Sequence, residues 1–211
     1  MQHPIEPVKR LAFLGGESSG KTTLARSLAQ ALGTVWVPEY GRQRWEELRA
    51  TLKVDELVHV AQVQVQWETE HQSRARSWLV CDTTPLTTLQ YCLHDHGEAP
   101  TELHRLARRT YDVTVLCLPD FGFVQDGCRR DNTFRQQQHD WTLERLAEME
   151  VVPLLVHGSV AERLGQVIAH LAAHPLGLGS CSTPPATPPG VPVEAGHQGQ
   201  QTTTRVQVTF K

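Results

Sequence analysis

The residues best suited to chemistry form one short stretch of this 211-residue chain. Residues 15–22 read G-G-E-S-S-G-K-T, which has the spacing G-x-x-x-x-G-K-T of a phosphate-binding loop. Glycines let the backbone turn its N–H groups toward a phosphate, Lys21 can reach the β- and γ-phosphates, and the Thr22 hydroxyl can bind Mg²⁺. We therefore predict that ATP is bound by Gly15, Gly16, Glu17, Ser18, Ser19, Gly20, Lys21, Thr22 and Thr23.

The loop has the flanking segments that this motif requires. An apolar run at residues 11–14 precedes it, and a helical pattern at residues 23–32 follows it. The positive end of the helix dipole would add to the attraction for phosphate. The alternative is a glycine-rich turn that merely caps a helix.

Two carboxylates follow two further apolar segments. Glu39 comes after residues 34–37, and Asp82 comes after the continuous apolar run 78–81. Asp82 is placed to bind Mg²⁺ directly or through water, and Glu39 could bind a sugar and take the proton of an attacking hydroxyl. Asp82 could be the base instead, and either carboxylate could simply cap the helix that follows it. The sequence leaves these alternatives open.

Arginines follow the fourth apolar segment, residues 113–118. Small P-loop kinases have a lid at this position that brings arginines onto the phosphates, and an arginine there stabilises the charge of the transferred phosphoryl group. The corresponding segment here, about residues 120–135, contains Arg129, Arg130 and Arg135. We predict that at least one of them contacts phosphate, although the sequence does not show which.

Four aromatic residues are candidates for stacking on the flat ring of an acceptor. They are Tyr40, Trp45, Trp67 and Tyr91. For each one alone, packing in the core or on a helix face is the simpler interpretation. We expect one of the four to lie near the acceptor.

The elements that must position these groups alternate along the chain. Strands are predicted at residues 11–14, 34–37, 78–81, 113–118 and 151–156. Helices are predicted at 23–32, 43–50, 55–76, 83–94, 101–109 and 134–148, with a last helix that ends near residue 173. This order predicts an α/β fold of the P-loop NTPase type: a doubly wound, five-stranded, mainly parallel sheet with helices on both faces, as in nucleoside and nucleotide kinases. Pro153 favours an edge position for the fifth strand.

Composition limits the classes of function. A net charge of −3, from 20 basic and 23 acidic residues, gives no reason to expect nucleic acid or an anionic membrane as partner. Five scattered cysteines, no secretory signal and no apolar run of ~20 residues lead us to expect reduced thiols and a cytoplasmic location. We expect one domain over residues 1–173 and a flexible tail rich in Pro, Gly, Ser and Thr over 174–211. Oligomeric state stays open, and a homo-oligomer is one option.

Five blocks of sequence, in order, resemble the ribosylnicotinamide kinase domain of the NadR family, a P-loop small-molecule kinase of the AAA-like ATPase type. The blocks are residues 15–23, 38–42, 81–88, 111–112 and 118–129, and the resemblance covers about residues 11–171. It implies phosphorylation of the 5′-hydroxyl of nicotinamide riboside, with Mg²⁺ and ATP, to give nicotinamide mononucleotide for NAD salvage. Larger members carry an adenylyltransferase domain ahead of the kinase, and some carry a DNA-binding helix-turn-helix. We expect this chain to lack both, because only a handful of residues precede its first strand.

The resemblance also implies roles for single residues. Glu39, Tyr40 and Arg42 would lie in the riboside and acceptor region, and Asp82 would be the metal or base carboxylate. Asp126 and Arg129 would belong to the lid, Asp126 near the substrate and Arg129 in catalysis together with Lys21. Residues 157–159 would lie where such kinases hold adenine.

Two alternatives keep the fold but change the function. A kinase of another nucleoside is the nearer one, because a glutamate after the second strand suits any ribose-like acceptor. A nucleotide-binding regulatory ATPase without an acceptor is the other. It leaves the acceptor-side carboxylate and the arginine-rich lid without a role. Guanine nucleotides are disfavoured because no N-K-x-D segment follows the fourth strand.

Overall fold

The computed structural model describes residues 7–120, 122–123 and 130–173 of the chain. The predicted tail at residues 174–211, part of the predicted lid, and the predicted site residues Asp126 and Arg129 lie outside these described residues. None of the helices in the described ranges is long and apolar enough to cross a membrane.

Strands and helices alternate along the described residues. The strands are β1 (Lys9–Leu14), β2 (Trp36–Val37), β3 (Trp78–Cys81), β4 (Val113–Cys117) and β5 (Leu154–Val156). The helices are α1 (Lys21–Leu32), α2 (Tyr40–Leu48), α3 (Val54–Gln72), α4 (Pro85–His96), α5 (Thr101–Ala107), α6 (Asn132–Glu148) and α7 (Val160–Ala173). Each predicted element is present, although β2 and β5 are shorter than predicted and α2 begins three residues earlier.

The strands form one sheet in the order β2-β3-β1-β4-β5, and every neighbouring pair is parallel. The predicted parallel α/β class is therefore confirmed, and β5 is at an edge as Pro153 indicated. Because all strands run in the same direction, the segments that follow them meet at one edge of the sheet. The phosphate loop, Glu39 and Asp82 follow β1, β2 and β3, so the fold brings them to this edge.

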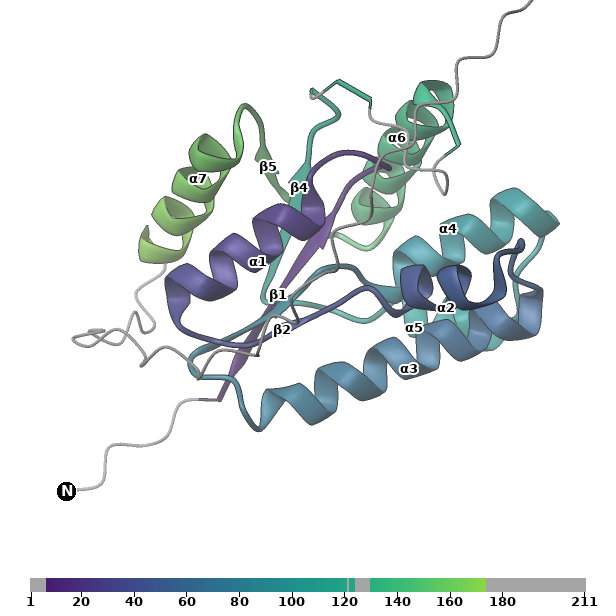
Figure 1. Cartoon of the computed structure of the whole chain (residues 1–211), viewed down its shortest axis with the longest axis horizontal. Helices are drawn as coiled ribbons and strands as arrows, with labels where there is room; N and C mark the ends of the chain where they lie inside the picture. The colour runs from purple at the N-terminus through teal and green to yellow at the C-terminus, as the bar shows by residue number, and fades with distance from the viewer. Residues whose placement is uncertain (1–6, 121, 124–129, 174–211) are drawn as a thin grey trace, which may run out of the picture.

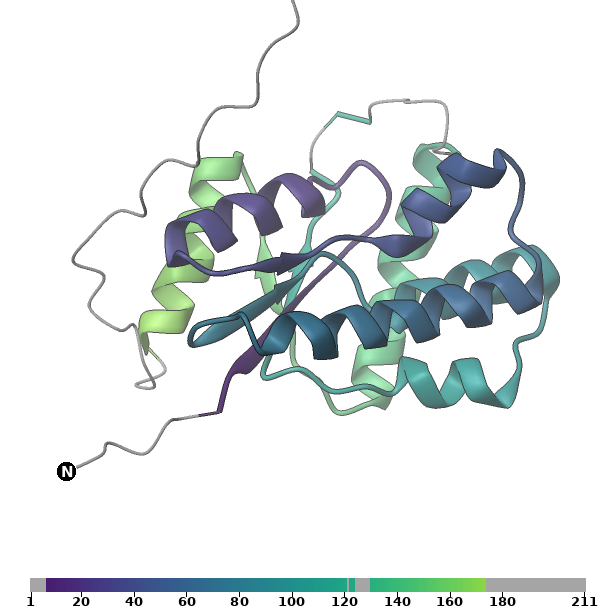
Figure 2. The same cartoon turned by 60° about the horizontal axis from the view of Figure 1, so that its bottom comes forward.

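Both faces of the sheet are covered, as the apolar strands predicted. Leu11 and Phe13 of β1 pack in a core with residues of α1 and α7. Leu14 points to the face opposite Leu11 and Phe13. It packs there with residues of α3, α4, α5 and α6. Figures 1 and 2 show these two layers, with α1 and α7 beside each other and α2 beyond the carboxyl ends of the strands. The alternation of side chains along β1 thus anchors the loop that follows it from both sides.

Candidate functional site

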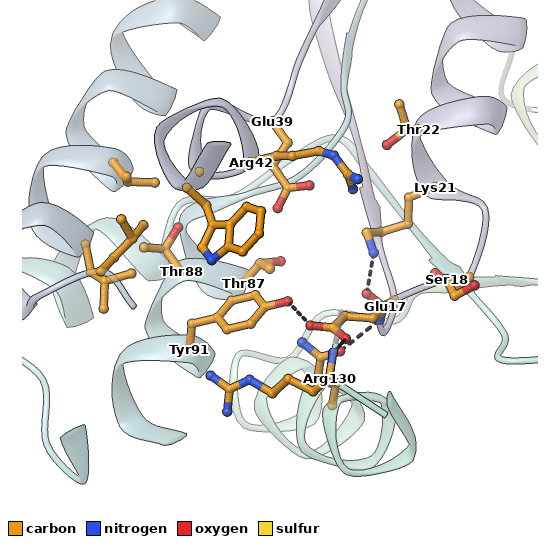
Figure 3. Close-up of a pocket in the computed structure, with 18 of the residues that line it drawn as sticks. Glu17, Ser18, Lys21, Thr22, Glu39, Arg42, Thr87, Thr88, Tyr91 and Arg130 are labelled. Carbon is orange, nitrogen blue, oxygen red and sulfur yellow. Dashed lines mark hydrogen bonds between the residues drawn. The ribbon is translucent and has the colours of Figure 1, made fainter. Parts of the chain in front are cut away.

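The phosphate loop between β1 and α1 is shaped by very close packing. A Cβ atom on Gly16 would lie 2.6 Å from the carbonyl oxygen of Arg135, so a larger residue would push the loop away from α6. Gly15 has a φ of +141°, which favours glycine. Lys21 donates from Nζ to the carbonyl oxygens of Gly15, at 2.8 Å, and Gly16, at 2.9 Å. These bonds hold the ammonium group at the mouth of the loop (Figure 3).

A cavity of about 370 Å³ lies beside this loop. The phosphate loop and the start of α1 line one end of it, and parts of α2, α3, α4 and α6 line the rest. Most of the predicted nucleotide and acceptor residues are on its wall: Gly15, Glu17, Ser18, Ser19, Gly20, Lys21, Thr22, Thr23, Glu39, Arg42 and Arg130. Residues that the sequence did not single out also line it, among them Thr51, Thr87, Asp95 and Gln138.

Glu39 lies at the corner between β2 and α2. It occupies the N-cap position of α2, but its side chain makes no capping hydrogen bond. The carboxylate instead faces the cavity, next to Arg42 (Figure 3). The capping alternative for Glu39 therefore does not describe this structure, and the cavity-facing position agrees with an acceptor-side carboxylate.

Tyr40 takes a different direction from the one expected for a substrate contact. It is not among the residues that line the cavity. Its ring packs edge-on against Trp67 with centroids 5.0 Å apart, and its hydroxyl lies 3.5 Å from Nε2 of His59. Glu39 has an extended backbone and the helix begins at Tyr40, so the two side chains leave the backbone in different directions, Tyr40 toward α3 and Glu39 toward the cavity.

Asp82 lies just behind the cavity wall with only 1% of its surface exposed. Burial, and next the negative charge of Glu39, raise the pKa of Asp82 to about 6, while the hydroxyl of Thr22 donates a hydrogen bond to it. Its Oδ1 atom has no hydrogen-bond partner among the described residues. Helix α4 is capped by Thr84, whose hydroxyl accepts from the N–H of Leu86 at 3.2 Å, so Asp82 is not the cap.

An oxygen-lined position beside the phosphate loop fits the Mg²⁺ that the sequence implies. The buried Oδ1 of Asp82 lacks a partner, and the Thr22 hydroxyl lies next to the same carboxylate. Mg²⁺ is a hard cation that prefers carboxylate and hydroxyl oxygens, often one or two of them together with substrate phosphates. A divalent cation here would give the orphaned oxygen a partner and offset the cost of burying the charge.

Glu17 has a role in this structure that the motif alone does not reveal. Its Oε1 accepts from the hydroxyl of Tyr91 at 2.8 Å, and its Oε2 accepts from the N–H of Arg130 at 2.7 Å. Its own N–H donates to Oε1 of Gln138 at 2.8 Å. Burial, and then the charge of Glu17, raise the pKa of Tyr91 well above its usual value, so the phenol remains a donor. Glu17 thus ties the phosphate loop to α4 and to the start of α6.

The two described arginines of the predicted lid differ in position. Arg130 lines the cavity, where its guanidinium interacts with His94 and Asp95 of α4 and lies 4.4 Å from the centroid of the Phe134 ring. Arg135 does not line the cavity; it is buried, and its guanidinium lies 5.6 Å from the centroid of the Phe123 ring. Its side chain lies against Gly16, behind the phosphate loop, and its contact with phosphate stays a prediction.

Part of the cavity wall is apolar and aromatic. Trp45 and Tyr91, two of the four candidate aromatic residues, line it together with Leu52, Leu57 and Val60. The other two candidates, Tyr40 and Trp67, pack against each other instead. The cavity therefore combines a phosphate-binding end with a wall suited to a flat ring.

Arg163 on α7 supports the loop from the other side, and no local pattern in the sequence indicated it. Its side chain is 1% exposed and donates to the carbonyl oxygens of Ser19 at 2.7 Å, Leu118 at 3.0 Å and Gly158 at 2.9 Å. It also pairs with Asp120. These contacts join the phosphate loop to the ends of β4 and β5, next to the segment 157–159 that was expected near adenine.

A family model described as an AAA domain matches residues 10–163 of the chain. The chain belongs to this AAA domain family. The trifunctional NAD biosynthesis/regulator protein NadR of Escherichia coli (strain K12) is 28% identical to it over 151 residues, which are 68% of this chain and 37% of NadR. The AAA domain protein thus spans little more than a third of the length of that relative.

Solved structures of NadR show the same fold. A crystal structure of NadR in complex with NR matches with a TM-score of 0.65 and 20% identity over 79% of this chain and 52% of that one. A crystal structure of NadR in complex with NAD and AMP-PNP matches with a TM-score of 0.63 and 19% identity over 79% of this chain and 49% of that one. The AAA domain described here is a NadR-like P-loop domain, as the sequence blocks predicted.

Proposed function

We propose that this AAA domain protein is a P-loop kinase that transfers the γ-phosphoryl group of ATP to a nucleoside, and that nicotinamide riboside is its acceptor. The observation that carries the proposal is one cavity of about 370 Å³ that joins a phosphate loop, a carboxylate and two aromatic side chains. The relatives support this choice of donor and acceptor. One is named for NAD biosynthesis, and the NadR structures contain NR in one case and NAD with AMP-PNP in the other.

The donor end of the cavity is suited to the phosphates of ATP. Backbone N–H groups of the loop and the start of α1 bind the β-phosphate, and the ammonium of Lys21 neutralises the charge of the β- and γ-phosphates. Thr22 and Asp82 would hold Mg²⁺, which supplies further positive charge to the phosphates when it is bound. Arg42, whose side chain also lines the cavity, adds positive charge near the transferred group.

On the acceptor side we assign the base to Glu39. Its carboxylate faces the cavity, whereas Asp82 is buried behind the wall beside Thr22. Glu39 accepts the proton of the 5′-hydroxyl as the hydroxyl oxygen attacks the γ-phosphorus, and the bond from that phosphorus to the bridging oxygen breaks to release ADP. The mechanism requires a base within hydrogen-bond reach of the hydroxyl, and the cavity-facing carboxylate of Glu39 supports its assignment to this role.

The aromatic side chains of the cavity wall suit a flat ring. The rings of Trp45 and Tyr91 offer flat apolar surfaces to a base, and the phenol of Tyr91 is oriented by its hydrogen bond to Glu17. The guanidinium groups of Arg49 and Arg130 already lie 5.9 and 5.8 Å from the ring centroids of Trp45 and Tyr91, so the rings alone do not favour a cation. The NR bound to the NadR relative supports the choice of nicotinamide riboside.

An acceptor panel tests the proposal. ADP release from Mg-ATP would be measured with nicotinamide riboside, uridine, cytidine, adenosine, thymidine and no acceptor, with the phosphorylated product identified by mass. We expect turnover with nicotinamide riboside well above the others. A preference for another nucleoside would keep the kinase and reject this acceptor. Hydrolysis that no nucleoside stimulates would favour the regulatory ATPase instead.

Tyr91→Phe should weaken the acceptor site because it removes the bond that orients the ring. The change leaves Oε1 of the buried Glu17 without the phenol, so we expect the free energy of unfolding to fall by about 1–3 kcal/mol. The less restrained ring should raise KM for the nucleoside by about fivefold to tenfold, which is about 1 kcal/mol. Urea denaturation and steady-state kinetics measure the two effects.

Tyr111→Phe is the matched control for this variant. Its hydroxyl donates to another buried carboxylate, Oε1 of Glu68, at 2.8 Å, but it lies before β4 and away from the cavity. The control should lose stability with an unchanged KM. Equal effects of both variants on KM would contradict an orienting role for the hydroxyl of Tyr91.

A further inference from the structure

Gln64 of α3 holds the backbone on both sides of Glu39. Its side chain is 1% exposed. Oε1 accepts from the N–H of Tyr40 at 3.0 Å, and Nε2 donates to the carbonyl oxygen of Pro38 at 3.1 Å. One amide therefore binds the residue before Glu39 and the residue after it.

The corner that Gln64 holds has little support from within its own segment. Strand β2 contains two residues, and α2 begins without a side-chain cap. The N–H of Tyr40, in the first turn of α2, would otherwise be one of the unpaired donors at a helix start. Contacts from other elements fix the direction of this segment: the N–H of Asp82 donates to the carbonyl oxygen of Val37 at 3.0 Å, the Tyr40 ring packs on Trp67, and Gln64 binds the backbone on both sides of Glu39.

Helix α3 is a rigid support for such a contact. Val60 and Ala61, one turn before Gln64, are buried, and Ala61 packs in the same core as Leu14 of β1. A Cβ atom on Gly41 would lie 3.3 Å from Cγ1 of Val60, so α2 and α3 are in close contact next to the corner. The amide of Gln64 is thereby fixed relative to the strand that leads into the phosphate loop.

We propose that Gln64 is a positioning residue that directs the Glu39 carboxylate toward the acceptor hydroxyl. The inference rests on the proposed function, in which Glu39 takes the hydroxyl proton. This positioning requires a side chain at residue 64 that has both a hydrogen-bond acceptor and a hydrogen-bond donor. Methionine has a similar length but provides neither strong group, and an ionised glutamate can accept from Tyr40 but cannot donate to Pro38.

The variants Gln64→Met and Gln64→Glu test the inference, with activity expressed per nucleotide-binding site as counted by titration with a non-hydrolysable ATP analogue. We expect kcat with the best acceptor of the panel to fall about 10- to 100-fold in Gln64→Met, because small misplacements of a catalytic group cost that much. Gln64→Glu should also lower kcat, because its carboxylate can accept from Tyr40 but places an oxygen against the carbonyl oxygen of Pro38. KM for ATP should stay within about twofold in both.

Gln66→Met is the matched control. Gln66 lies on the same helix, is exposed, and donates to Glu70 at 2.7 Å. The same substitution there should leave kcat unchanged. If Gln64→Met does not fold, the comparison is made between Gln64→Glu and Gln66→Glu.

A double-mutant cycle separates positioning from a general effect on the fold. In a Glu39→Gln background, where the base is already removed, Gln64→Met should reduce kcat by less than about twofold, because residues that act as a unit are not additive. The inference would be overturned if Gln64→Met lowered kcat as much in the Glu39→Gln background as in wild type, or if folded Gln64→Met showed no loss of kcat. Either result would leave the proposed function standing. If wild-type protein shows no nucleoside-dependent turnover, the proposed function fails and the inference fails with it.

Discussion

Lys21→Ala should remove nearly all phosphoryl transfer and leave the protein folded. We expect kcat to fall by about 10²- to 10³-fold or more, because the ammonium stabilises charge on the transferred group in a position that water cannot replace. In the structure its Nζ contacts two carbonyl oxygens at the mouth of the loop, at 2.8 and 2.9 Å, and packs no core. Its loss should therefore affect catalysis far more than folding.

The measurement is nucleoside-dependent ADP release together with the urea unfolding curve of the same preparation. Lys53→Ala, which removes an exposed ammonium outside the cavity lining, is the control and should keep its activity. Normal turnover by a folded Lys21→Ala protein would show that the loop is not the phosphate site. A collapse of the unfolding curve would show that Lys21 is needed for folding.

Asp82→Asn should stabilise the metal-free protein at neutral pH while it removes turnover. Burial and the charge of Glu39 raise the pKa of Asp82 from its usual 3.8 to about 6. A carboxyl group with a raised pKa binds its proton more tightly in the folded state, so this contribution to stability is complete below pH 3.8 and is lost as the pH rises through about 6. Above that pH the buried charge costs up to about 3 kcal/mol, and asparagine avoids this cost.

Urea denaturation with EDTA at pH 8 and at pH 4 checks the prediction. We expect Asp82→Asn to exceed wild type at pH 8 and to approach it at pH 4. Asp140→Asn, an exposed substitution on α6, should change stability by less than about 0.5 kcal/mol at both values. A variant that is less stable than wild type at pH 8 would mean that the Asp82 charge is already well compensated without metal.

Asp82→Asn also tests the metal assignment. The amide of asparagine is a neutral and weaker ligand for Mg²⁺, so turnover should fall by orders of magnitude and higher Mg²⁺ should restore only part of it. The gain in stability together with the loss of activity is the pattern expected when a buried charge is kept for function. Full activity at ordinary Mg²⁺ would assign the metal to other residues.

Much of the candidate site could be predicted because its signals are local. The phosphate loop needs eight consecutive residues, 15–22, and its strand and helix follow from the adjoining pattern. Asp82 and Glu39 could be placed because parallel strands bring their carboxyl ends to one edge. The helix predicted at residues 83–94 corresponds to α4, which begins at Pro85 with Thr84 as its cap.

The contacts that orient the site carry no local signal. Glu17 reaches Tyr91 and Gln138, which are 74 and 121 residues away, and Gln64 reaches Pro38 across 26 residues. Gln64 lies on the same helical face as Leu57 and Val60, which indicates burial, but the sequence does not show which groups its amide binds. The same limit applies to Arg163, which lies 144 residues from the Ser19 carbonyl oxygen that it binds.

The sequence by itself determined where the strands and helices lie in the chain, the phosphate loop and the two carboxylates. These features depend on periodicity and on a short motif, which involve neighbouring residues. Only the tertiary structure decided the directions of the side chains. Glu39 faces the cavity, whereas Tyr40 packs against Trp67. Arg135 lies behind the loop, and Trp45 and Tyr91 are the candidate aromatic residues that line the cavity. The physical reason is that such directions depend on which helix faces pack together, and packing joins residues that are distant in the chain.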